Sequence, residues 1–325
     1  MTKEPRIVVV GGGTGLAVLL KGLKRYTSCL TAIVTVSDDG GSSGRLRAEM
    51  GVLPPGDIRN CLVALAETET LMDQVFQHRF NAGGGIQGHT LGNLLLVAMS
   101  EIAGDFISAI QEVSKVLAVR GVVLPATLEP VVLAATMKNG STVIGETRIR
   151  NHEGKIERIS LIPEKCMPVP ETLLAIQEAD AIILGPGSLY TSIIPNLLVN
   201  KVAESIQQAK APVIYVSNIM TEKGETDDFT AADHLRAINR HLNRQLIDYV
   251  IINSGTVDEQ RLRRYRQEQA VPVRPAYEDI EAMGIKISKQ DLVSDNEVAW
   301  HDSNKLARAV LDLLEGKNNA GEKNQ

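Results

Sequence analysis

The sequence predicts an α/β protein: an open, mostly parallel sheet with helices on both faces and a small antiparallel hairpin insertion. Short apolar runs such as "RIVVV" and "AIVTV" are followed by glycine or aspartate turns and then by helix-like segments. These runs show little alternation of polar and apolar residues, which is typical of strands buried on both faces. One Asn-Gly pair lies between two extended runs and predicts a hairpin.

The N-terminal segment reads as strand, tight loop, helix and strand. Residues 6–10 form a β-branched run that ends in glycines, and residues 14–25 carry leucines three and four positions apart. The next extended run is 32–36. Because the connection in such a βαβ unit is right-handed and the strands it joins are parallel, we expect a parallel sheet to begin here.

Later segments repeat or interrupt this pattern. Residues 57–119 are mostly helical, and the Asn139-Gly140 turn places the hairpin insertion near 130–162. Further strand-and-turn runs are expected at 179–188, 211–218 and 248–255.

No linker divides the chain. We therefore expect a single α/β nucleotide-binding domain over 1–315. Residues 316–325, "GKNNAGEKNQ", hold one alanine as their sole apolar residue and are expected to form a disordered tail.

Composition narrows the classes of function. A chain of 325 residues with 44% hydrophobic content can bury one large core, and a net charge of -5 provides no field that gathers nucleic acid. Cys29, Cys61 and Cys166 are far apart and form no CxxC pair, so neither disulfides nor a zinc site is indicated. No apolar run is long enough for membrane insertion or a signal peptide. We expect a cytoplasmic protein that does not bind nucleic acid.

The loop "GGGTG" after the first strand predicts a phosphate site. It lacks the Lys-Ser/Thr of a P-loop, and its glycines do not complete GxGxxG. Gly11, Gly12, Gly13 and Gly15 would let backbone N–H groups approach a ligand, and Thr14 could cap the helix or bind an oxygen. A tight turn alone needs fewer glycines, so we favour a bound phosphate.

The segment "TVSDDGGSSGRLR" follows the second strand. Asp38 lies at the distance beyond the glycine loop where dinucleotide-binding folds place a ribose-binding acid. We expect one of Asp38 and Asp39 to contact a ribose hydroxyl or magnesium and the other to cap the turn, with the spacing favouring Asp38 as the ligand contact. Ser42 and Ser43 offer small donors, and Arg45 either meets an anionic ligand or lies on a solvated helix start.

Two helix starts carry polar groups that could face a site. In "PPGDIRNCL", Asn60 is a candidate ligand contact, whereas Asp57 is expected to cap its helix. In "GHTLGN", Asn93 precedes a very apolar helix and is a second candidate. His89 is isolated from other metal-binding types in the sequence, so no metal ligand is assigned.

The second half of the chain adds a glycine turn and an aromatic candidate. In "GPGSLYTS", the groups Gly185, Gly187 and Ser188 could hold a second phosphate, and Asn218 follows the next strand. Tyr265 lies in the arginine-rich "RLRRYRQ". It either packs beneath a solvated helix face or stacks on a uracil ring.

Six motifs together resemble one family. "GGGTGL", "TVSDDGGSSGRLR", "PPGDIRNCLVALAE", "GHTLGNLLL", "GPGSLYTSIIPNLL" and "YVSNIMTEKGETDDFTAADH" occur in the order found in the gluconeogenesis factor family, bacterial relatives of phospholactate transferase, and the resemblance covers about 7–314. It implies a Rossmann-like fold, a cytoplasmic protein required for normal cell shape and growth on gluconeogenic carbon sources, and binding of nucleotide sugars such as UDP-N-acetylglucosamine. Expected partners are the nucleotide sugar, a second copy of the chain and regulators of cell-wall synthesis.

Three functions stay open at this point. The first is a nucleotide-sugar binding factor, favoured because the sequence holds no Ser-His-Asp, HExxH or Cys-His arrangement. The second is a magnesium-dependent, phosphoryl-linked transferase related to phospholactate transferase, in which Asp38 or Asp39 would hold the metal. The third is an NAD-binding oxidoreductase, suggested by the βαβ start and by the spacing to Asp38.

Overall fold

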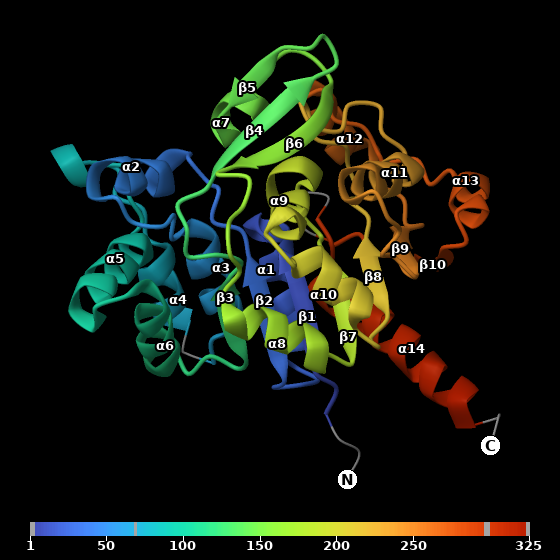
Figure 1. The fold of residues 1–325 in the computed structure, drawn as a ribbon, viewed down its shortest axis with the longest axis horizontal. Helices are drawn as coiled ribbons and strands as arrows, with labels where there is room; N and C mark the ends of the chain where they lie inside the picture. Colours follow the sequence, from blue (N-terminus) through green and yellow to red (C-terminus); the bar gives the residue numbers. More distant parts are fainter. Residues whose placement is uncertain (1–3, 68–69, 296–299, 323–325) are drawn as a thin grey trace.

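The computed structural model describes residues 4–67, 70–295 and 300–322. Its centre is a seven-stranded sheet in which each neighbouring pair is parallel (Figure 1). From one edge to the other the strands are β10 (Lys286–Gln290), β9 (Tyr249–Asn253), β8 (Val213–Val216), β7 (Ala181–Leu184), β1 (Ile7–Gly11), β2 (Leu30–Val34) and β3 (Val122–Pro125). The predicted parallel α/β sheet is confirmed.

The order of the strands reverses between β1 and β7. From β1 the chain proceeds to β2 and β3 at one edge, whereas β7 starts the run through β8 and β9 to β10 at the other. β1 and β7 are direct neighbours, with Ile7 paired to Ala181 and Val10 to Leu184. Loops that leave such neighbours in opposite directions open a crevice at their carboxyl ends, where open α/β sheets bind ligands.

Helices cover both faces because successive strand residues point to opposite sides. Ile7 and Val9 join one buried cluster, and Val8 and Val10 join the other. The first cluster is closed by α1 (Gly13–Leu23), α3 (Gly56–Leu65), α4 (Thr70–Gln77), α5 (Leu91–Ala103), α6 (Phe106–Val116) and α14 (Ser303–Glu322). The second is closed by α8 (Pro170–Glu178), α9 (Ile194–Leu198), α10 (Val202–Gln208), α11 (Ala231–Leu242) and α13 (Tyr277–Ala282).

A small antiparallel sheet lies above the parallel one (Figure 1). β4 (Val132–Met137) and β5 (Thr142–Ile144) form the hairpin predicted from Asn139-Gly140. β6 (Ile156–Ile162) adds a third strand on the other side of β4, so the insertion is a sheet rather than a hairpin alone. The short helix α7 (Glu146–Arg150) connects β5 to β6, and its Arg150 Nε lies 3.8 Å from the carboxylate of the buried Glu225.

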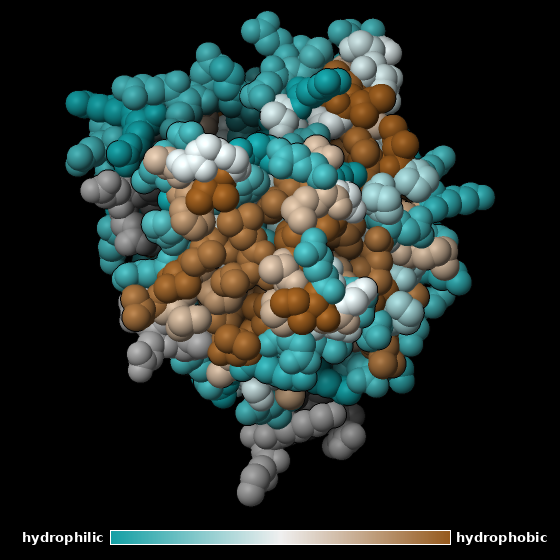
Figure 2. Space-filling model, turned by 90° about the vertical axis from the view of Figure 1, so that its left-hand side faces the viewer, coloured by the Kyte–Doolittle hydropathy of each residue, from teal (hydrophilic) through white to brown (hydrophobic). Residues whose placement is uncertain are grey.

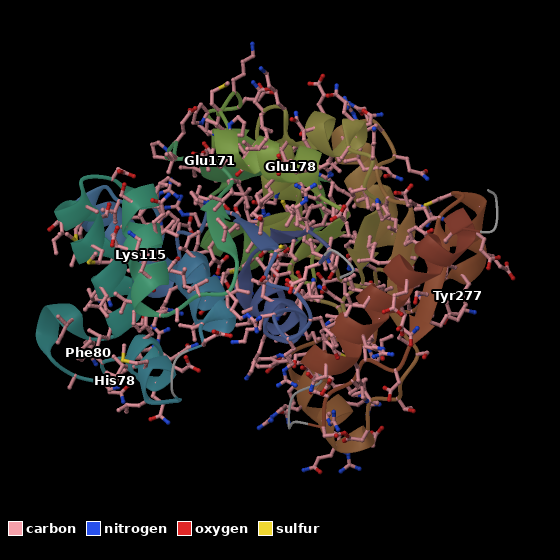
Figure 3. The ribbon with its side chains drawn as sticks, turned by 90° about the horizontal axis from the view of Figure 1, so that it is seen from below. His78, Phe80, Lys115, Glu171, Glu178 and Tyr277 are labelled. Carbon is pink, nitrogen blue, oxygen red and sulfur yellow. The ribbon has the colours of Figure 1, made fainter. Side chains whose placement is uncertain are left out.

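Two further helices complete the molecule. α2 (Gly41–Met50) lies with α4–α6 at the β3 end, whereas α12 (Glu259–Gln267) is seen near α11 and the small sheet, and α13 lies at the β10 end (Figure 1). Seen from below, His78, Phe80 and Lys115 mark the first end and Tyr277 the second (Figure 3). The rings of His78 and Phe80 meet edge to face, with centroids 5.0 Å apart.

The face formed at the β3 end is rich in apolar side chains (Figure 2). Ile102 on α5 is 77% exposed and Val116 on α6 is 66% exposed. No single described helix is long and apolar enough to cross a membrane. α5 and α6 reach that length and apolarity only as a pair, which bends by 118° at its junction.

The expectation of a disordered tail from 316 is wrong for 316–322, because α14 continues to Glu322. Residues 323–325 of that tail lie outside the described residues. Extending an existing helix costs much less than starting one. α14 is anchored upstream by the buried Leu306, Ala307 and Val310, so a polar composition does not end it.

Candidate functional site

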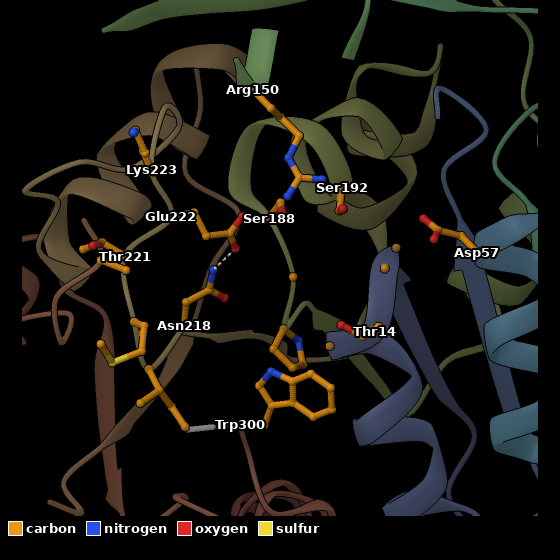
Figure 4. Close-up of a pocket in the computed structure, with 18 of the residues that line it drawn as sticks. Thr14, Asp57, Arg150, Ser188, Ser192, Asn218, Thr221, Glu222, Lys223 and Trp300 are labelled. Atoms are coloured by element: carbon orange, nitrogen blue, oxygen red, sulfur yellow. Dashed lines mark hydrogen bonds between the residues drawn. The ribbon is translucent and has the colours of Figure 1, made fainter. Parts of the chain in front are cut away.

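A cavity of about 1010 Å³ opens at the carboxyl ends of the central strands (Figure 4). Its walls come from the loops after β1, β2, β7 and β8, from α7 of the small sheet, and from α12 and the segment before α14. The cavity therefore occupies the crevice that the reversed strand order creates.

Ten of the candidates from the sequence line this cavity. They are Gly12, Gly13, Thr14, Gly15, Asp38, Asn60, Gly187, Ser188, Asn218 and Tyr265. They belong to segments separated by more than two hundred residues in the chain, so the fold gathers motifs that the sequence offers one at a time.

Seven other candidates lie outside the lining. They are Gly11, Asp39, Ser42, Ser43, Arg45, Asn93 and Gly185. Two of them serve the backbone of the central strands: the N–H of Gly185 donates to the carbonyl of Val10 at 2.9 Å, and the amide of Asn196 donates to the carbonyl of Gly11 at 2.9 Å.

Ser42 and Asn93 belong to a buried polar network instead. Ser42 Oγ lies 3.0 Å from His89 Nδ1 and accepts from Asn93 Nδ2 at 3.0 Å. The guanidinium of the buried Arg59 donates to Asn93 Oδ1 at 3.0 Å and also to the Thr90 hydroxyl. Because buried polar groups need partners, these side chains join α2, α3 and α5 to one another.

Ser43 and Arg45 have similar structural partners. Ser43 Oγ accepts from the N–H of Gly56 at 3.1 Å, and Arg45 donates to the carbonyl of Gln87 at 2.5 Å. Arg45 therefore connects α2 to the loop before α5.

The glycines of the first loop are required by packing. A Cβ at Gly12 would lie 2.6 Å from Asp57 Oδ2, and one at Gly15 would lie 2.7 Å from the carbonyl oxygen of Pro186. Gly13 has φ +67°, a conformation that disfavours any side chain. The loops after β1 and β7 thus touch backbone to backbone, which explains the excess of glycine without a ligand.

The start of α1 is nevertheless suited to an anion. Its N-cap, Gly12, makes no side-chain cap, and its first turn contains no acidic residue. The first amide groups of a helix lack partners within the helix and carry partial positive charge. Thr14 is exposed there and adds a hydroxyl beside Gly13.

Carboxyl groups gather on another side of the cavity. Burial, with Asp38, Asp57 and Glu225 nearby, raises the pKa of Glu146 to about 9. Burial and the charge of Asp38 raise the pKa of Asp57 to about 6, although the backbone N–H of Gly13 opposes that change. At neutral pH Glu146 therefore holds its proton and can donate a hydrogen bond.

The expected cap by Asp57 is wrong, since the N-cap of α3 is Pro55 and that end makes no side-chain cap. Asp57 turns instead toward Gly12 and Gly13. The residues before this helix start form a proline turn, which leaves the carboxyl group free to reach the neighbouring loop.

Glu222 fixes two of the candidate contacts. Its carboxylate accepts from Ser188 Oγ at 2.5 Å and from Asn218 Nδ2 at 2.9 Å (Figure 4). The buried Glu225 accepts from Thr191 Oγ1 at 2.8 Å and lies 3.8 Å from Arg150 Nε. Burial raises the pKa of both glutamates. These acids hold the donors of the β7 and β8 loops in place.

The sequence analysis missed several lining residues, chiefly Asp57, Glu146, Arg150, Glu222 and Trp300. Glu146 and Arg150 come from "GETRIR", directly after the hairpin, and their position over the sheet depends on how the small sheet packs. Trp300 is the one tryptophan of the sequence, and its polar surroundings could have marked it as a ligand contact.

The residues do not present a preformed metal centre. Within 4–67, 70–295 and 300–322, no group of three or more His, Cys, Asp or Glu side chains is arranged to hold a metal ion. Asp38 faces the cavity, whereas Asp39 is engaged elsewhere. The geometry thus leaves magnesium without a defined ligand set, and no step is assigned to it.

Comparison with known proteins identifies the family. The family model described as 2-phospho-L-lactate transferase CofD matches residues 7–293. The "Gluconeogenesis factor" of Bacillus subtilis is 50% identical over 315 residues, which cover 97% of this chain and 99% of the relative. The chain belongs to the gluconeogenesis factor family.

A second gluconeogenesis factor and a solved structure support the same family assignment. The "Gluconeogenesis factor" of Listeria innocua is 45% identical over 325 residues, covering 99% of this chain and 100% of the relative. The X-ray structure of a Bacillus halodurans protein is 47% identical and superimposes with a TM-score of 0.93 over 95% of this chain and 100% of that one. The resemblance inferred from six motifs and the predicted fold class are both confirmed.

Proposed function

We propose that this gluconeogenesis factor is a cytoplasmic protein that binds a nucleotide sugar of the UDP-N-acetylglucosamine class. The observation that carries the proposal is the cavity at the β1–β7 reversal, where the amide-rich start of α1 adjoins both aromatic and carboxyl side chains. A diphosphate suits the helix start, a base suits an aromatic wall, and sugar hydroxyls suit carboxyl and amide groups. The binding supports normal cell shape and growth on gluconeogenic carbon sources.

Binding without reaction is favoured by how the polar side chains are engaged. Ser188 donates to Glu222, and Thr191 donates to Glu225, so neither hydroxyl is paired with a histidine that could activate it. Glu222 instead positions Ser188 and Asn218 at the cavity wall, and Glu225 holds the buried backbone and hydroxyl behind it.

The transferase remains a second candidate because the CofD model matches most of the chain. Such a reaction would require a metal or cation to offset charge on the diphosphate during attack at phosphorus. Arg150 and Lys223 are cations among the residues that line the cavity, together with Asp38 and Glu146. NAD is a third candidate ligand, which competition against UDP-N-acetylglucosamine would distinguish.

Two measurements test the proposal. Calorimetry should detect UDP-N-acetylglucosamine in chelator and show weaker or no binding of NADH. Incubation with radiolabelled UDP-N-acetylglucosamine and magnesium should return the ligand unchanged by chromatography. Absence of binding at millimolar ligand would contradict the proposal, and a labelled product would favour the transferase.

A growth experiment tests the cellular role. The chain, expressed in Bacillus subtilis from which the gluconeogenesis factor has been deleted, should restore rod shape and growth on a gluconeogenic carbon source. Variants that lose nucleotide-sugar binding should fail to restore either. Their success would separate the cellular role from the ligand.

We also propose self-association and contact with cell-wall synthesis regulators. The exposed apolar side chains of α5 and α6, including Ile102 and Val116, are compatible with a protein contact (Figure 2). Light scattering of the native protein and of an Ile102→Glu variant should differ in mass if two copies meet on this face.

A further inference from the structure

We propose that Trp300 is the platform on which the nucleobase stacks, and that it sets the direction in which a nucleotide sugar lies. The base would lie at the Trp300 end, the diphosphate across the glycine loops, and the sugar toward Glu146 and Arg150. This inference rests on the proposed function and extends it to the ligand's orientation.

The indole of Trp300 is available to a ligand. It lines the cavity while 48% exposed, an unusual state for the largest apolar side chain. In the view of Figure 4, Trp300 and Arg150 lie on opposite sides of the pocket, with Thr14 on the Trp300 side. A flat aromatic surface of this kind stacks with any base, because every base has a π-face.

Hydrogen bonds hold the backbone that carries Trp300 at this place. The carbonyl of Trp300 accepts from the N–H of Ser294 at 2.9 Å, and His301 pairs with Val293 in an isolated bridge. His301 Nε2 donates to the carbonyl of Ser217, at the end of β8, at 3.1 Å. Burial lowers the pKa of His301 to about 4, so the imidazole stays neutral in this contact at physiological pH. A stacking surface fixed in advance loses less entropy on binding.

Tyr265 is less suited to the same role. It packs against the buried cluster formed by Ile219, Met220, Val257 and Val293, so its ring is partly covered by the protein. That cluster adjoins Trp300, because Val293 is the residue that pairs with His301. Tyr265 therefore forms the apolar wall behind the base, and Trp300 supplies the open face.

The opposite side of the cavity suits the sugar. Glu146 holds a proton at neutral pH and Arg150 adds donors, so both can bind hydroxyl or acetamide oxygens. A diphosphate across the glycine loops would lie at the partial positive charge of the α1 start, where the Gly13 N–H already donates to the Asp57 carboxyl group. The aromatic wall at the Trp300 end and the polar groups at the Arg150 end thus favour one of the two directions.

The sequence contains one tryptophan, so fluorescence excited selectively at tryptophan reports on Trp300 alone. We would titrate the native protein with UDP and with UDP-N-acetylglucosamine, following fluorescence and calorimetry in parallel. Calorimetry would then be repeated on Trp300→Ala, Trp300→Phe and Glu146→Ala. Leu174→Ala, which truncates an exposed apolar side chain on α8 outside the cavity, is the matched control. Circular dichroism checks that each variant is folded.

Stacking predicts a specific pattern. Both ligands should change the fluorescence, and Trp300→Ala should weaken UDP and UDP-N-acetylglucosamine by the same factor, between about 5-fold and 100-fold. Trp300→Phe should recover part of the loss, Leu174→Ala should lose nothing, and Glu146→Ala should weaken UDP-N-acetylglucosamine more than UDP.

Three results would overturn the inference. Unchanged affinities in Trp300→Ala, with the native protein binding normally, would remove Trp300 from the site and leave the proposed function intact. A loss confined to UDP-N-acetylglucosamine would place the sugar at Trp300 and reverse the direction. No binding of either ligand by the native protein in calorimetry would contradict the proposed function, and the inference with it.

Discussion

Asp39 and Thr147 join the second strand's loop to the helix of the small sheet. One carboxylate oxygen of Asp39 accepts both from the backbone N–H of Thr147 at 2.8 Å and from its hydroxyl at 2.7 Å. Asp38, its neighbour, lines the cavity and accepts from the N–H of Gly40 at 2.9 Å. The two adjacent acids therefore have separate roles, one at the start of α7 and one facing the cavity.

Substitutions at these acids should separate stability from affinity. Asp39→Ala removes both bonds to Thr147 and should lower the free energy of unfolding by about 0.5–2 kcal/mol. Asp38→Asn keeps an oxygen for Gly40, so we expect nearly unchanged stability and an altered Kd for UDP-N-acetylglucosamine. Urea unfolding and calorimetry measure the two effects. Equal effects of both variants on affinity, with no loss of stability in Asp39→Ala, would contradict this division.

Substitutions in the loop after β1 should likewise affect stability and ligand affinity separately. Gly15→Ala would place a Cβ 2.7 Å from the Pro186 carbonyl, and we expect it to cost about 1–3 kcal/mol of stability. Thr14→Val keeps the shape of an exposed side chain but removes its hydroxyl, so UDP affinity should fall several-fold at an unchanged melting temperature. If Thr14→Val binds normally, this hydroxyl does not contact the ligand.

The free energy of unfolding should fall as the pH rises, because Glu146 loses its proton. Its pKa is about 9 in the folded protein, above the ordinary glutamate value, so the folded state holds more protons than the unfolded state between about pH 4.5 and 9. Unfolding free energy therefore declines as pH rises through this window, by at most about 1.4 kcal/mol per unit from this group. Glu146→Gln should make the decline shallower, most clearly above pH 7, because Asp57 and Glu225 titrate lower in the window. Glu153→Gln, on the exposed surface, should leave the decline unchanged.

Ligand affinity should also depend on pH. Between about pH 6 and 9, Asp57 and then Glu146 lose their protons and add negative charge beside a diphosphate. In chelator, UDP should bind more weakly as pH rises, and the double variant Asp57→Asn with Glu146→Gln should flatten the trend. A magnesium ion held by these carboxylates would give the opposite slope, because metal binding releases protons. Calorimetry across this pH range distinguishes the two.

Local sequence patterns predicted the central strands because they are continuously apolar. The edge strand β10 escaped prediction for the same reason: it reads "KISKQ" and buries only Ser288, so no apolar run marks it. β2 begins at Leu30, two residues before the apolar run that suggested it, since its pairing with Ile7 on β1 sets the boundary. Strand ends depend on partners that one segment does not reveal.

The candidate site was predictable where glycine or an acid follows a strand, as at Gly12 and Asp38. Glu146 and Trp300 could not be placed in the same way, because α7 reaches the cavity through the packing of the small sheet and Trp300 through its pairing beside β8. Ser42 and Asn93 were predicted as ligand contacts, but they lie in the buried polar network instead. Polar residues at helix starts satisfy one another in the interior as readily as they meet a ligand.

The contact between Gly22 on α1 and the start of α14 has a consequence for synthesis of the chain. A Cβ at Gly22 would lie 1.9 Å from the carbonyl oxygen of Ser303, so the two helices meet at backbone distance. During translation the N-terminal strand and helix emerge first, yet one side of α1 stays uncovered until residues beyond Ser303 leave the ribosome. The glycine loop thus acquires its final support near the end of translation, and a nascent chain stalled before that point should be sensitive to proteases around α1.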